Sequence, residues 1–385
     1  MPILQHLIAE AIAWRHEFHA NPELGYEEFA TSQRVAELLT SFGLQVHTGL
    51  GGTGIVATLE NGQGPTIGLR ADMDALPITE LGEASYKSRN KGVMHACGHD
   101  GHTAILLAAA KHLSETRNFS GTVHFVFQPA EENLGGAYKM VADGLFERFP
   151  MDGIYALHNW PGLPVGHVGL SSGAMMASLD SFEITITGKS CHAAMPENGS
   201  DPIIAASLLI QSLQTIAARR LSPQSSAVVS ITQISGGEAI NVIPEKVTLR
   251  GTMRCLQTDV RIKVKDLINE FVNELPRVFG VRGEITYYPG YPVTMNHEQE
   301  ALNVREAVSS IFGESKLHWQ INPSMASEDF ACMLEACPGA YLWLGSDGVE
   351  PSKPLHNAYY DFNDELIKPG VELWTSLVER LLLKS

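Results

Sequence analysis

Long apolar runs are missing from this sequence of 385 residues, and so are blocks of like charge. No apolar run approaches the roughly 18 residues that a membrane-spanning helix needs, so we expect no transmembrane helix and no membrane partner. The first residues do not combine a basic stretch with an apolar core, which predicts an amphipathic helix and no secretory signal. Cysteine is scarce: five residues are an odd number in a long chain, which argues against a disulfide framework and favours a reducing, cytoplasmic location.

Basic residues are also in short supply. Lys and Arg total 27 against 43 Asp and Glu, and the formal net charge is −16. Because phosphate contacts need clustered basic side chains, we expect no nucleic-acid partner. Hydrophobic residues make up 44% of the chain, and the length exceeds what one compact core usually supports. The composition therefore predicts a globular protein with two domains.

The order of predicted elements follows two patterns. Strands alternate with helices over residues 1–179 and again over 295–385, which predicts an α/β core with a mixed, mostly parallel sheet flanked by helices. Residues 180–294 follow the order strand–helix–strand–strand–helix–strand, which is the ferredoxin-like α+β arrangement. Its six segments are 181–187, 202–219, 227–234, 246–254, 259–279 and 284–288. We therefore predict a core domain, 1–179 with 295–385, interrupted by a smaller inserted domain, 180–294.

The segment MHACGHDGHTA, residues 94–104, carries two metal-ligand side chains two residues apart, Cys97 and His99. A glycine-bearing loop can turn both toward one ion, whereas helix positions two apart diverge. Thiolate and imidazole are good ligands for zinc and its neighbours. The segment therefore predicts part of a metal site. His102 lies three residues after His99, and we assign it a structural or supporting role.

Three other segments supply ligand types. Glu131 and Glu132 follow the predicted strand 121–128, His158 ends another predicted strand, and His356 lies in a loop. In open α/β sheets, sites form at the carboxyl ends of the strands. Adjacent glutamates can divide the work, one binding metal and the other acting on water. The set predicts metal-assisted hydrolysis, in which ions polarise a carbonyl and activate water while a carboxylate transfers the proton.

Ten stretches, in order over nearly the whole chain, carry a resemblance to a known family. They are WRHEFHANPELGYEE (14–28), GLRADMDALPI (68–78), MHACGHDGHTA (94–104), QPAEE (128–132), LHNWPG (157–162), GKSCHAAMPENGSDP (188–202), GGEAINVIPE (236–245), GTMR (251–254), SEDF (327–330) and LHNAYYDFND (355–364). Together they resemble the aminoacylase and hippurate hydrolase branch of the dinuclear zinc metallopeptidases, which includes plant auxin-conjugate hydrolases. The resemblance implies a metal-dependent amidohydrolase that cleaves N-acyl amino acids.

The resemblance also implies roles for individual residues. Two divalent metal ions would bind per chain, zinc by default and manganese, nickel or cobalt as alternatives. Cys97 would bridge them, where the broader superfamily usually has an aspartate. The remaining ligands would be His99, Glu132, His158 and His356. Glu131 would be the general base, and one of Asp72 and Asp74 would orient a ligand.

The inserted domain carries a polar set of its own: His192, Asn241 and Arg254. In similar enzymes these positions bind the substrate carboxylate or stabilise the oxyanion, which suits a bidentate Arg and hydrogen-bond donors. The resemblance implies that this domain is a lid that also carries a dimer contact. His192 would then serve its own site or that of a neighbouring subunit.

Three alternatives stay open. The same dinuclear site would suit a dipeptidase as well as an enzyme for N-acetyl, N-benzoyl or indole-acetyl amino acids. A thiol hydrolase with Cys97 as nucleophile and His99 as base would leave the glutamate pair without a role. A non-catalytic binding protein would have lost a ligand or Glu131, and none is missing. We expect His16 and His19, in the first helix, to cap it or to face solvent.

Overall fold

The computed structural model describes residues 5–132 and 135–383, and the chain falls into two compact units. Unit 1 comprises residues 1–175, 294–322 and 329–385, and unit 2 comprises residues 176–293 and 323–328. Each unit has an apolar core of its own. The catalytic role and the lid role assigned to these parts of the chain stay predictions.

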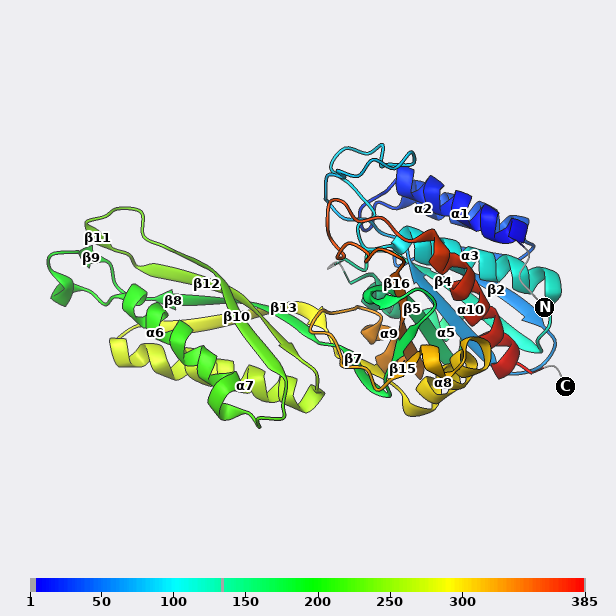
Figure 1. The fold of residues 1–385 in the computed structure, drawn as a ribbon. Coiled ribbons are helices and arrows are strands. Elements are labelled where there is room, and N and C mark those ends of the chain that lie inside the picture. Colours follow the sequence, from blue (N-terminus) through cyan, green and yellow to red (C-terminus); the bar gives the residue numbers. More distant parts are fainter. Residues whose placement is uncertain (1–4, 133–134, 384–385) are drawn as a thin grey trace. The chain divides into compact units, whose positions relative to one another are not determined.

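Unit 1 is built on an eight-stranded sheet with the order β1-β2-β4-β3-β5-β16-β6-β15 (Figure 1). Its strands are β1 (Gln45–Leu50), β2 (Gly54–Asn61), β3 (Thr66–Asp72), β4 (Gly121–Gln128), β5 (Gly153–Pro164), β6 (Val168–Leu170), β15 (Leu317–Trp319) and β16 (Gly339–Asp347). The pairs β4–β3, β3–β5, β5–β16 and β6–β15 are parallel, and the others are antiparallel. A small separate sheet pairs β7 (Gly173–Met176) with β14 (Thr294–Asn296).

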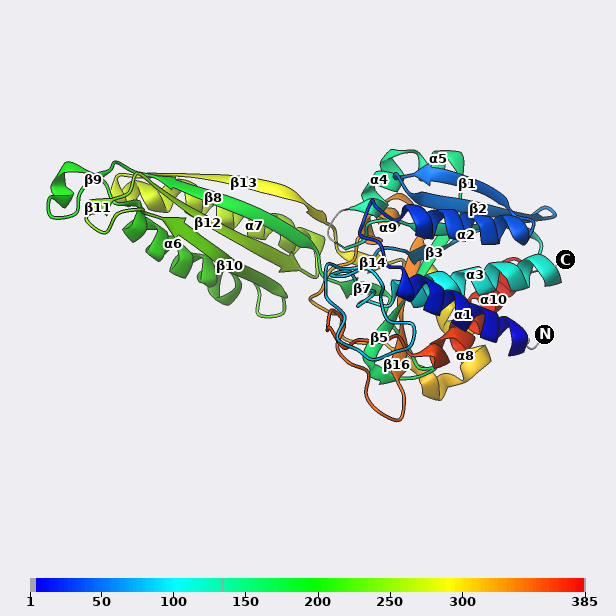
Figure 2. The same ribbon diagram turned by 90° about the horizontal axis from the view of Figure 1, so that it is seen from above.

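Helices cover both faces of this sheet (Figures 1 and 2). One layer contains α3 (His99–Thr116) and α10 (Ile367–Leu381), which pack together, with α1 (Gln5–Ala20), α2 (Phe29–Ser41) and α8 (Glu298–Phe312) beside them. The other layer contains α4 (Gly136–Ala142), α5 (Leu145–Arg148) and α9 (Ala331–Ala336). The two layers arise because the crossover from β3 to β4 and the crossover from β4 to β5 run in opposite directions across the sheet.

Burial follows from this layering. Residues Val123–Gln128 of β4 are all buried, as expected for a strand with helices over both faces. Helix α3 is buried nearly all round from His99 to Leu113, because it lies against the sheet and also contacts α1 and α10. Its first turn therefore lies in the interior at the sheet's carboxyl edge.

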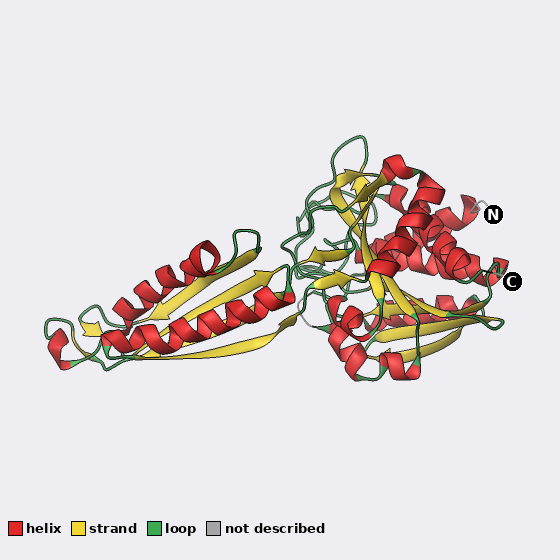
Figure 3. Cartoon of the chain, turned by 90° about the horizontal axis from the view of Figure 1, so that it is seen from below, coloured by secondary structure: helices red, strands yellow, loops and turns green. Residues whose placement is uncertain are grey.

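Unit 2 contains a four-stranded antiparallel sheet with the order β10-β12-β8-β13. Its elements are β8 (Leu179–Thr187), β9 (Cys191–His192), α6 (Pro202–Thr215), β10 (Ala227–Gly236), β11 (Val242–Ile243), β12 (Lys246–Cys255), α7 (Thr258–Glu274) and β13 (Arg282–Tyr291). Helices α6 and α7 lie on one face of the sheet (Figure 3). In β8 every second residue is buried, and Phe182, Ile184 and Ile186 point toward those helices.

Both parts of the predicted fold class are confirmed. Unit 1 has the mixed, mostly parallel sheet flanked by helices, and unit 2 has the element order and strand order of a ferredoxin-like α+β domain. Over the part of the chain that the structure describes, no helix combines the length and the apolar character needed to cross a membrane.

Candidate metal centre and active site

The carboxyl ends of three neighbouring strands lie level in unit 1. Arg70 of β3 pairs with Val126 of β4 and with Ala156 of β5, so Asp72, Gln128 and His158 come two residues later on each strand. Glu131 and Glu132 follow β4 directly, as the strand-end argument predicts. The structure thus brings these side chains to one edge of the sheet.

Two glycines allow the start of α3 to approach this edge closely. Gly98 precedes the helix with φ +93°, and a Cβ there would lie 2.2 Å from Oδ1 of Asn159. At Gly101, a Cβ would lie 2.3 Å from the ring of Phe362. A side chain at either position would therefore displace the turn that carries Cys97 and His99.

Cys97 lies among three of the predicted ligands. Its Sγ is 3.4 Å from Nε2 of His158, and ligand atoms of Cys97, Glu132 and His356 all lie within 4.8 Å of one another. Oε1 of Glu132 is 3.1 Å from Nε2 of His356. The predicted ligands from four separate segments therefore converge on one place.

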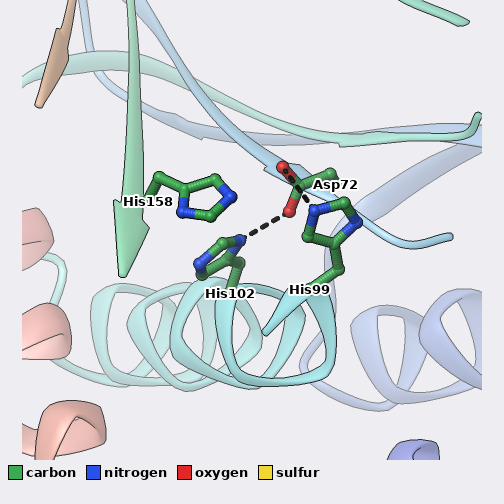
Figure 4. A group of neighbouring side chains, drawn as sticks. All are labelled: Asp72, His99, His102 and His158. Atoms are coloured by element: carbon green, nitrogen blue, oxygen red, sulfur yellow. Dashed lines mark hydrogen bonds and ion pairs between the residues drawn. The ribbon is translucent and has the colours of Figure 1, made fainter. Parts of the chain in front are cut away.

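His99 faces the same place from the first turn of α3. Its Nδ1 donates to Oδ1 of Asp74 at 3.2 Å, which leaves Nε2 4.0 Å from Oε1 of Glu132. The same Nε2 points toward Oδ2 of Asp72 at 3.7 Å (Figure 4). Nδ1 of His158 likewise donates to its neighbour's carbonyl, the oxygen of Asn159, at 2.7 Å. Each imidazole thus has one nitrogen fixed by a hydrogen bond and the other directed into the site, as metal-binding histidines do.

His102 is arranged differently. Its Nδ1 lies 2.6 Å from Oδ1 of Asp72 (Figure 4). Its Nε2 lies 2.6 Å from Oδ1 of Asn159 and 3.0 Å from the backbone nitrogen of that residue. The other oxygen of Asp72 accepts from Nη1 of Arg70 at 2.8 Å. Both ring nitrogens and both carboxylate oxygens therefore have protein partners, although Asp72, His99, His102 and His158 offer ligand atoms within 4.8 Å of one another.

Arg70 extends this support beneath the sheet edge. It is buried, and its Nε donates to Oε1 of Gln128 at 2.8 Å while Nη2 lies 3.4 Å from Oδ1 of Asp329. Gln128 in turn donates to Asp329 at 2.7 Å. This network fixes the ends of β3 and β4 relative to each other.

The site's electrostatics favour a positive charge. Burial alone would lower the pKa of His99, but the carboxylates of Asp72, Asp74 and Glu132 outweigh it and raise that pKa to about 10. Burial, with the charges of Glu132 and Glu131, raises the pKa of the Cys97 thiol well above its ordinary value. A thiolate would form there only beside a cation.

Whether these residues fit a metal ion can be judged from their unmet hydrogen-bonding capacity. Buried Oε1 of Glu132 contacts the imidazole of another proposed ligand, His356, at 3.1 Å, and buried Nε2 of His99 has no hydrogen-bond partner in the part of the chain that the structure describes. Buried polar atoms are rarely left in this way, so such atoms call for an explanation. Sulfur, imidazole and carboxylate donors together are the ligand set that zinc and similar ions take. The donor set therefore fits a metal centre.

Glu131 lies beside this donor set. It is buried at 7% exposure, and ligand atoms of His99, Glu131 and Glu132 lie within 4.8 Å of one another. The backbone N–H of Glu132 donates to Oδ2 of Asp74 at 2.9 Å, so Asp74 holds both His99 and the glutamate pair. A carboxylate in this position is within reach of a water molecule bound at the centre.

The predicted substrate-binding residues of unit 2 do not form one cluster. His192 and Asn241 are exposed and close together, because Val242 pairs with His192 and Ala193 donates to the carbonyl of Asn241 at 2.9 Å. Arg254 lies near the end of β12, eight residues beyond Lys246, which is roughly 25 Å along a strand. Nη1 of Arg254 donates to the carbonyl of Met325 at 3.0 Å.

Several functional neighbours were not singled out from the sequence. Arg70, Gln128 and Asn159 support the site through contacts made across strands, and sequence spacing gives no sign of such contacts. Arg70 and Gln128 do lie inside the stretches RADMD and QPAEE, so their position next to predicted site residues was the available signal.

Known proteins resemble this chain over nearly its whole length. Hippurate hydrolase from Campylobacter jejuni is 42% identical over 371 residues, covering 96% of this chain and 95% of that protein. N-acetyl-L-cysteine deacetylase from Bacillus subtilis is 41% identical over 384 residues, covering 98% of this chain and 90% of that protein.

A solved structure has the same fold. The crystal structure of a Bacillus subtilis protein, described as a dinuclear metal binding peptidase from the M20 family, superposes with a TM-score of 0.85 at 31% identity. The match covers 98% of this chain and 99% of that one. Residues 68–380 match the family described as Peptidase family M20/M25/M40. The resemblance inferred from the motifs is thereby confirmed: this chain belongs to the M20 peptidase family, in the branch that contains hippurate hydrolase and N-acetylcysteine deacetylase.

Proposed function

We propose that this protein hydrolyses the amide bond of small N-acyl amino acids at a centre of two divalent metal ions. The observation that carries the proposal is the convergence of thiol, imidazole and carboxylate donors from four segments, where no described residue hydrogen-bonds Nε2 of the buried His99. The proposed ligands are Cys97, His99, Glu132, His158 and His356. Zinc is the first candidate, and manganese, nickel and cobalt suit the same donors.

When bound, the metal ions would polarise the scissile carbonyl and lower the pKa of a bound water. The chain's own part begins with Glu131, which is buried next to the donor set and takes the proton of the attacking water. The same carboxyl then gives that proton to the departing amine. Cys97, in the middle of the donors, is the proposed bridge between the ions.

Asp74 and Asp72 have different proposed roles. Asp74 contacts both His99 and the backbone of Glu132, so it orients a ligand and the base segment together. Asp72 has its oxygens occupied by Arg70 and His102, so we assign it to the support of the centre rather than to metal binding. An alternative ligand set of Asp72, His99, His102 and His158 would require those hydrogen bonds to break.

The choice of substrate class draws on the relatives. Hippurate is an N-acyl amino acid, as is N-acetylcysteine, and the relatives named for them are 42% and 41% identical to this chain. A dipeptide presents the same amide and carboxylate, so dipeptidase activity at the same centre is the alternative. Whether acetyl, benzoyl or larger acyl groups are preferred is what a substrate panel would decide.

Unit 2 is proposed as a lid that also carries the contact between two copies of the chain. β10 is an edge strand of its sheet, with one neighbour among the described strands, and α6 exposes Ile203, Ile204 and Leu208. Unpaired edges and exposed apolar faces favour association. Since His192 and Asn241 lie far along the unit from Arg254, we propose that His192 and Asn241 contact substrate in the second copy's site. Ile204→Glu should yield monomers by light scattering, and persistent dimers would contradict this.

A thiol mechanism is the second candidate, because Sγ of Cys97 is 3.4 Å from Nε2 of His158. Against it, burial raises the pKa of Cys97, and burial beside other histidines lowers the pKa of His158. A neutral thiol beside a neutral imidazole is a weak nucleophile.

A panel of N-acetyl, N-benzoyl and dipeptide substrates tests the proposal. The purified protein is assayed as isolated, after removal of metal with a chelator, and after addition of zinc, manganese, nickel or cobalt. We expect hydrolysis of N-acyl amino acids that is lost on chelation and restored by one of these ions. Activity that survives chelation would overturn the metal mechanism in favour of the thiol one, and no hydrolysis of any substrate would overturn the proposed function.

A further inference from the structure

A buried arginine on the first helix joins two of the segments that carry proposed metal ligands. Arg15 of α1 is 0% exposed. Its Nε donates to Oδ1 of Asp364 at 2.9 Å, its Nη1 donates to Oδ1 of Asp361 at 2.9 Å, and Nη1 also lies 3.6 Å from Oδ2 of Asp100. Asp361 and Asp364 follow His356 in one segment, and Asp100 is the residue after His99.

The segment with His356 needs anchors. His356 itself has φ +63°, a left-handed conformation that is unfavourable for a residue with a Cβ and persists only where its surroundings impose it. Its backbone N–H donates to the carbonyl of Ala96 at 2.8 Å, next to Cys97. Farther along, Tyr360 and Phe362 are both 2% exposed and pack in the core.

Between these two buried aromatic residues lies Asp361, whose side chain is 44% exposed. Its two oxygens bind Nη1 of Arg15 and the hydroxyl of Tyr86, which donates at 2.7 Å. The segment is therefore held on one side by aromatic packing against the core and on the other by Arg15.

A contribution to fold stability alone does not explain a buried arginine at position 15. Its Nη2 is buried without a hydrogen-bond partner among the described residues, so its desolvation is not fully offset. Buried ion pairs are often no more stabilising than apolar residues of the same volume. A planar fork that contacts three carboxylates on two segments does, however, fix the distance between those segments.

We propose that Arg15 is a positioning residue for the metal centre, which holds the segment of His356 against the start of α3 so that His356 and Glu132 meet at one ion. The inference rests on the proposed function, since it concerns the same centre. It predicts that loss of the fork lowers the affinity for the ion that His356 binds and leaves the affinity for the other ion unchanged. Lysine keeps the charge but has a single ammonium group, so it cannot contact Asp361 and Asp364 in the same geometry.

The test compares four variants with the wild type. Arg15→Lys removes the fork, and Asp361→Asn weakens one arm of it at a side chain that is 44% exposed. His356→Ala removes the ligand itself. Arg34→Lys is the matched control, because Arg34 makes the same kind of fork to Glu17, at 2.9 and 3.2 Å, on an exposed surface. Metal-stripped protein is titrated with zinc against a competing chelator, and circular dichroism checks the fold of each variant.

We expect Arg34→Lys to bind two zinc ions with the same two affinities as the wild type. In Arg15→Lys the affinity for the ion that is also lost in His356→Ala should fall about 10- to 100-fold, the range typical of residues that orient metal ligands. The affinity for the other ion should be unchanged. Asp361→Asn should show a smaller loss at the same ion. Saturating zinc should restore turnover in Arg15→Lys but not in His356→Ala.

Three results would overturn the proposal while the proposed function stands: both ions binding normally in Arg15→Lys and Asp361→Asn, both ions weakening equally, or an unfolded Arg15→Lys beside an unaffected Asp361→Asn. A wild type that binds no zinc and hydrolyses no amide would instead overturn the proposed function, and this inference with it.

Discussion

The two units of the molecule bury charge in different ways. At the carboxyl edge of unit 1, Asp72, Asp74 and His99 are at most 1% exposed, and Nε2 of His99 has no hydrogen bond from any residue that the structure describes. In unit 2, the buried Asp180 is matched by Arg261 at 2.6 Å and Lys265 at 2.7 Å. Burying a charge is unfavourable unless it is paired. The comparison teaches that the buried carboxylate of unit 2 has its counter-charges within the same unit, whereas the edge of unit 1 calls for a cation.

Substitution of the proposed general base in unit 1 should cause the largest loss of activity. Glu131→Gln keeps the size of the side chain but cannot accept a proton, so kcat should fall by about 100- to 10,000-fold. Bound metal should be unchanged, because Glu131 is not a proposed ligand. Steady-state kinetics and elemental analysis measure the two effects. Glu60→Gln is the control, because Glu60 is exposed and pairs with Thr122 at the opposite end of β4. Full activity in Glu131→Gln would remove it from the mechanism.

A substitution in unit 2 should change turnover without touching the metal. His192 is exposed, so His192→Ala should fold normally, yet kcat should fall by roughly 100-fold if its imidazole stabilises the oxyanion. The same elemental analysis should still find the wild-type metal content. Loss of metal in this variant would contradict the proposal that only unit 1 holds the metal. Unchanged kinetics would show that His192 does not contact the reacting groups.

Within unit 1, Asp74 and Asp72 have different proposed roles, and metal affinity can distinguish them. Asp74→Asn removes the carboxylate that fixes His99 and the Glu132 backbone, so metal affinity should fall about 10- to 100-fold. Competition with a chelator measures this loss. Asp152→Asn, at the far edge of the sheet, is the matched control, because its carboxylate likewise accepts from a backbone N–H, that of Thr66 at 2.8 Å. Equal affinity in Asp74→Asn and wild type would mean that Asp72 alone supports the centre.

The smallest effect concerns the stability of unit 2 against pH. Burial would raise the pKa of Asp180, but hydrogen bonds from Arg261 and Lys265 outweigh it and lower that pKa. A lowered carboxyl pKa stabilises the fold above the unfolded value near ~4 and loses that contribution as pH falls through the folded value. Thermal unfolding should therefore show that unit 2 loses stability below about pH 4. Asp180→Asn should remove this pH dependence and lower the free energy of unfolding at neutral pH by about 1–2 kcal/mol. An Asp180→Asn melting curve with the wild-type acid dependence would contradict the assignment.

The fold class, and the meeting of the proposed ligand segments at one edge of the sheet, could be predicted from the sequence because both depend on local order. Strand ends place His158 and the Glu131–Glu132 pair at one edge, and Cys97 and His99 share one loop. The division between Asp72 and Asp74 was not predictable, since both lie in RADMD and only their hydrogen bonds distinguish them.

The contacts that could not be predicted join residues that lie far apart in the sequence. His19 was expected to cap its helix or to face solvent, but it is buried, with Nδ1 2.9 Å from Asp100. Burial alone would lower the pKa of His19, yet the hydrogen bonds to Asp100 and Glu80 raise it to about 9. Helical periodicity indicated neither this contact nor the partners of Arg15, which lie 346 and 349 residues away.

Metal content per chain tests the central claim most directly. Elemental analysis of the wild type, Cys97→Ala and Cys191→Ala compares the proposed bridge with a half-buried cysteine of unit 2. Two ions per chain in the wild type and in Cys191→Ala, falling sharply in Cys97→Ala, is the predicted result. A wild type that hydrolyses N-acyl amino acids without bound metal, or a Cys97→Ala protein that keeps both ions, would contradict the account.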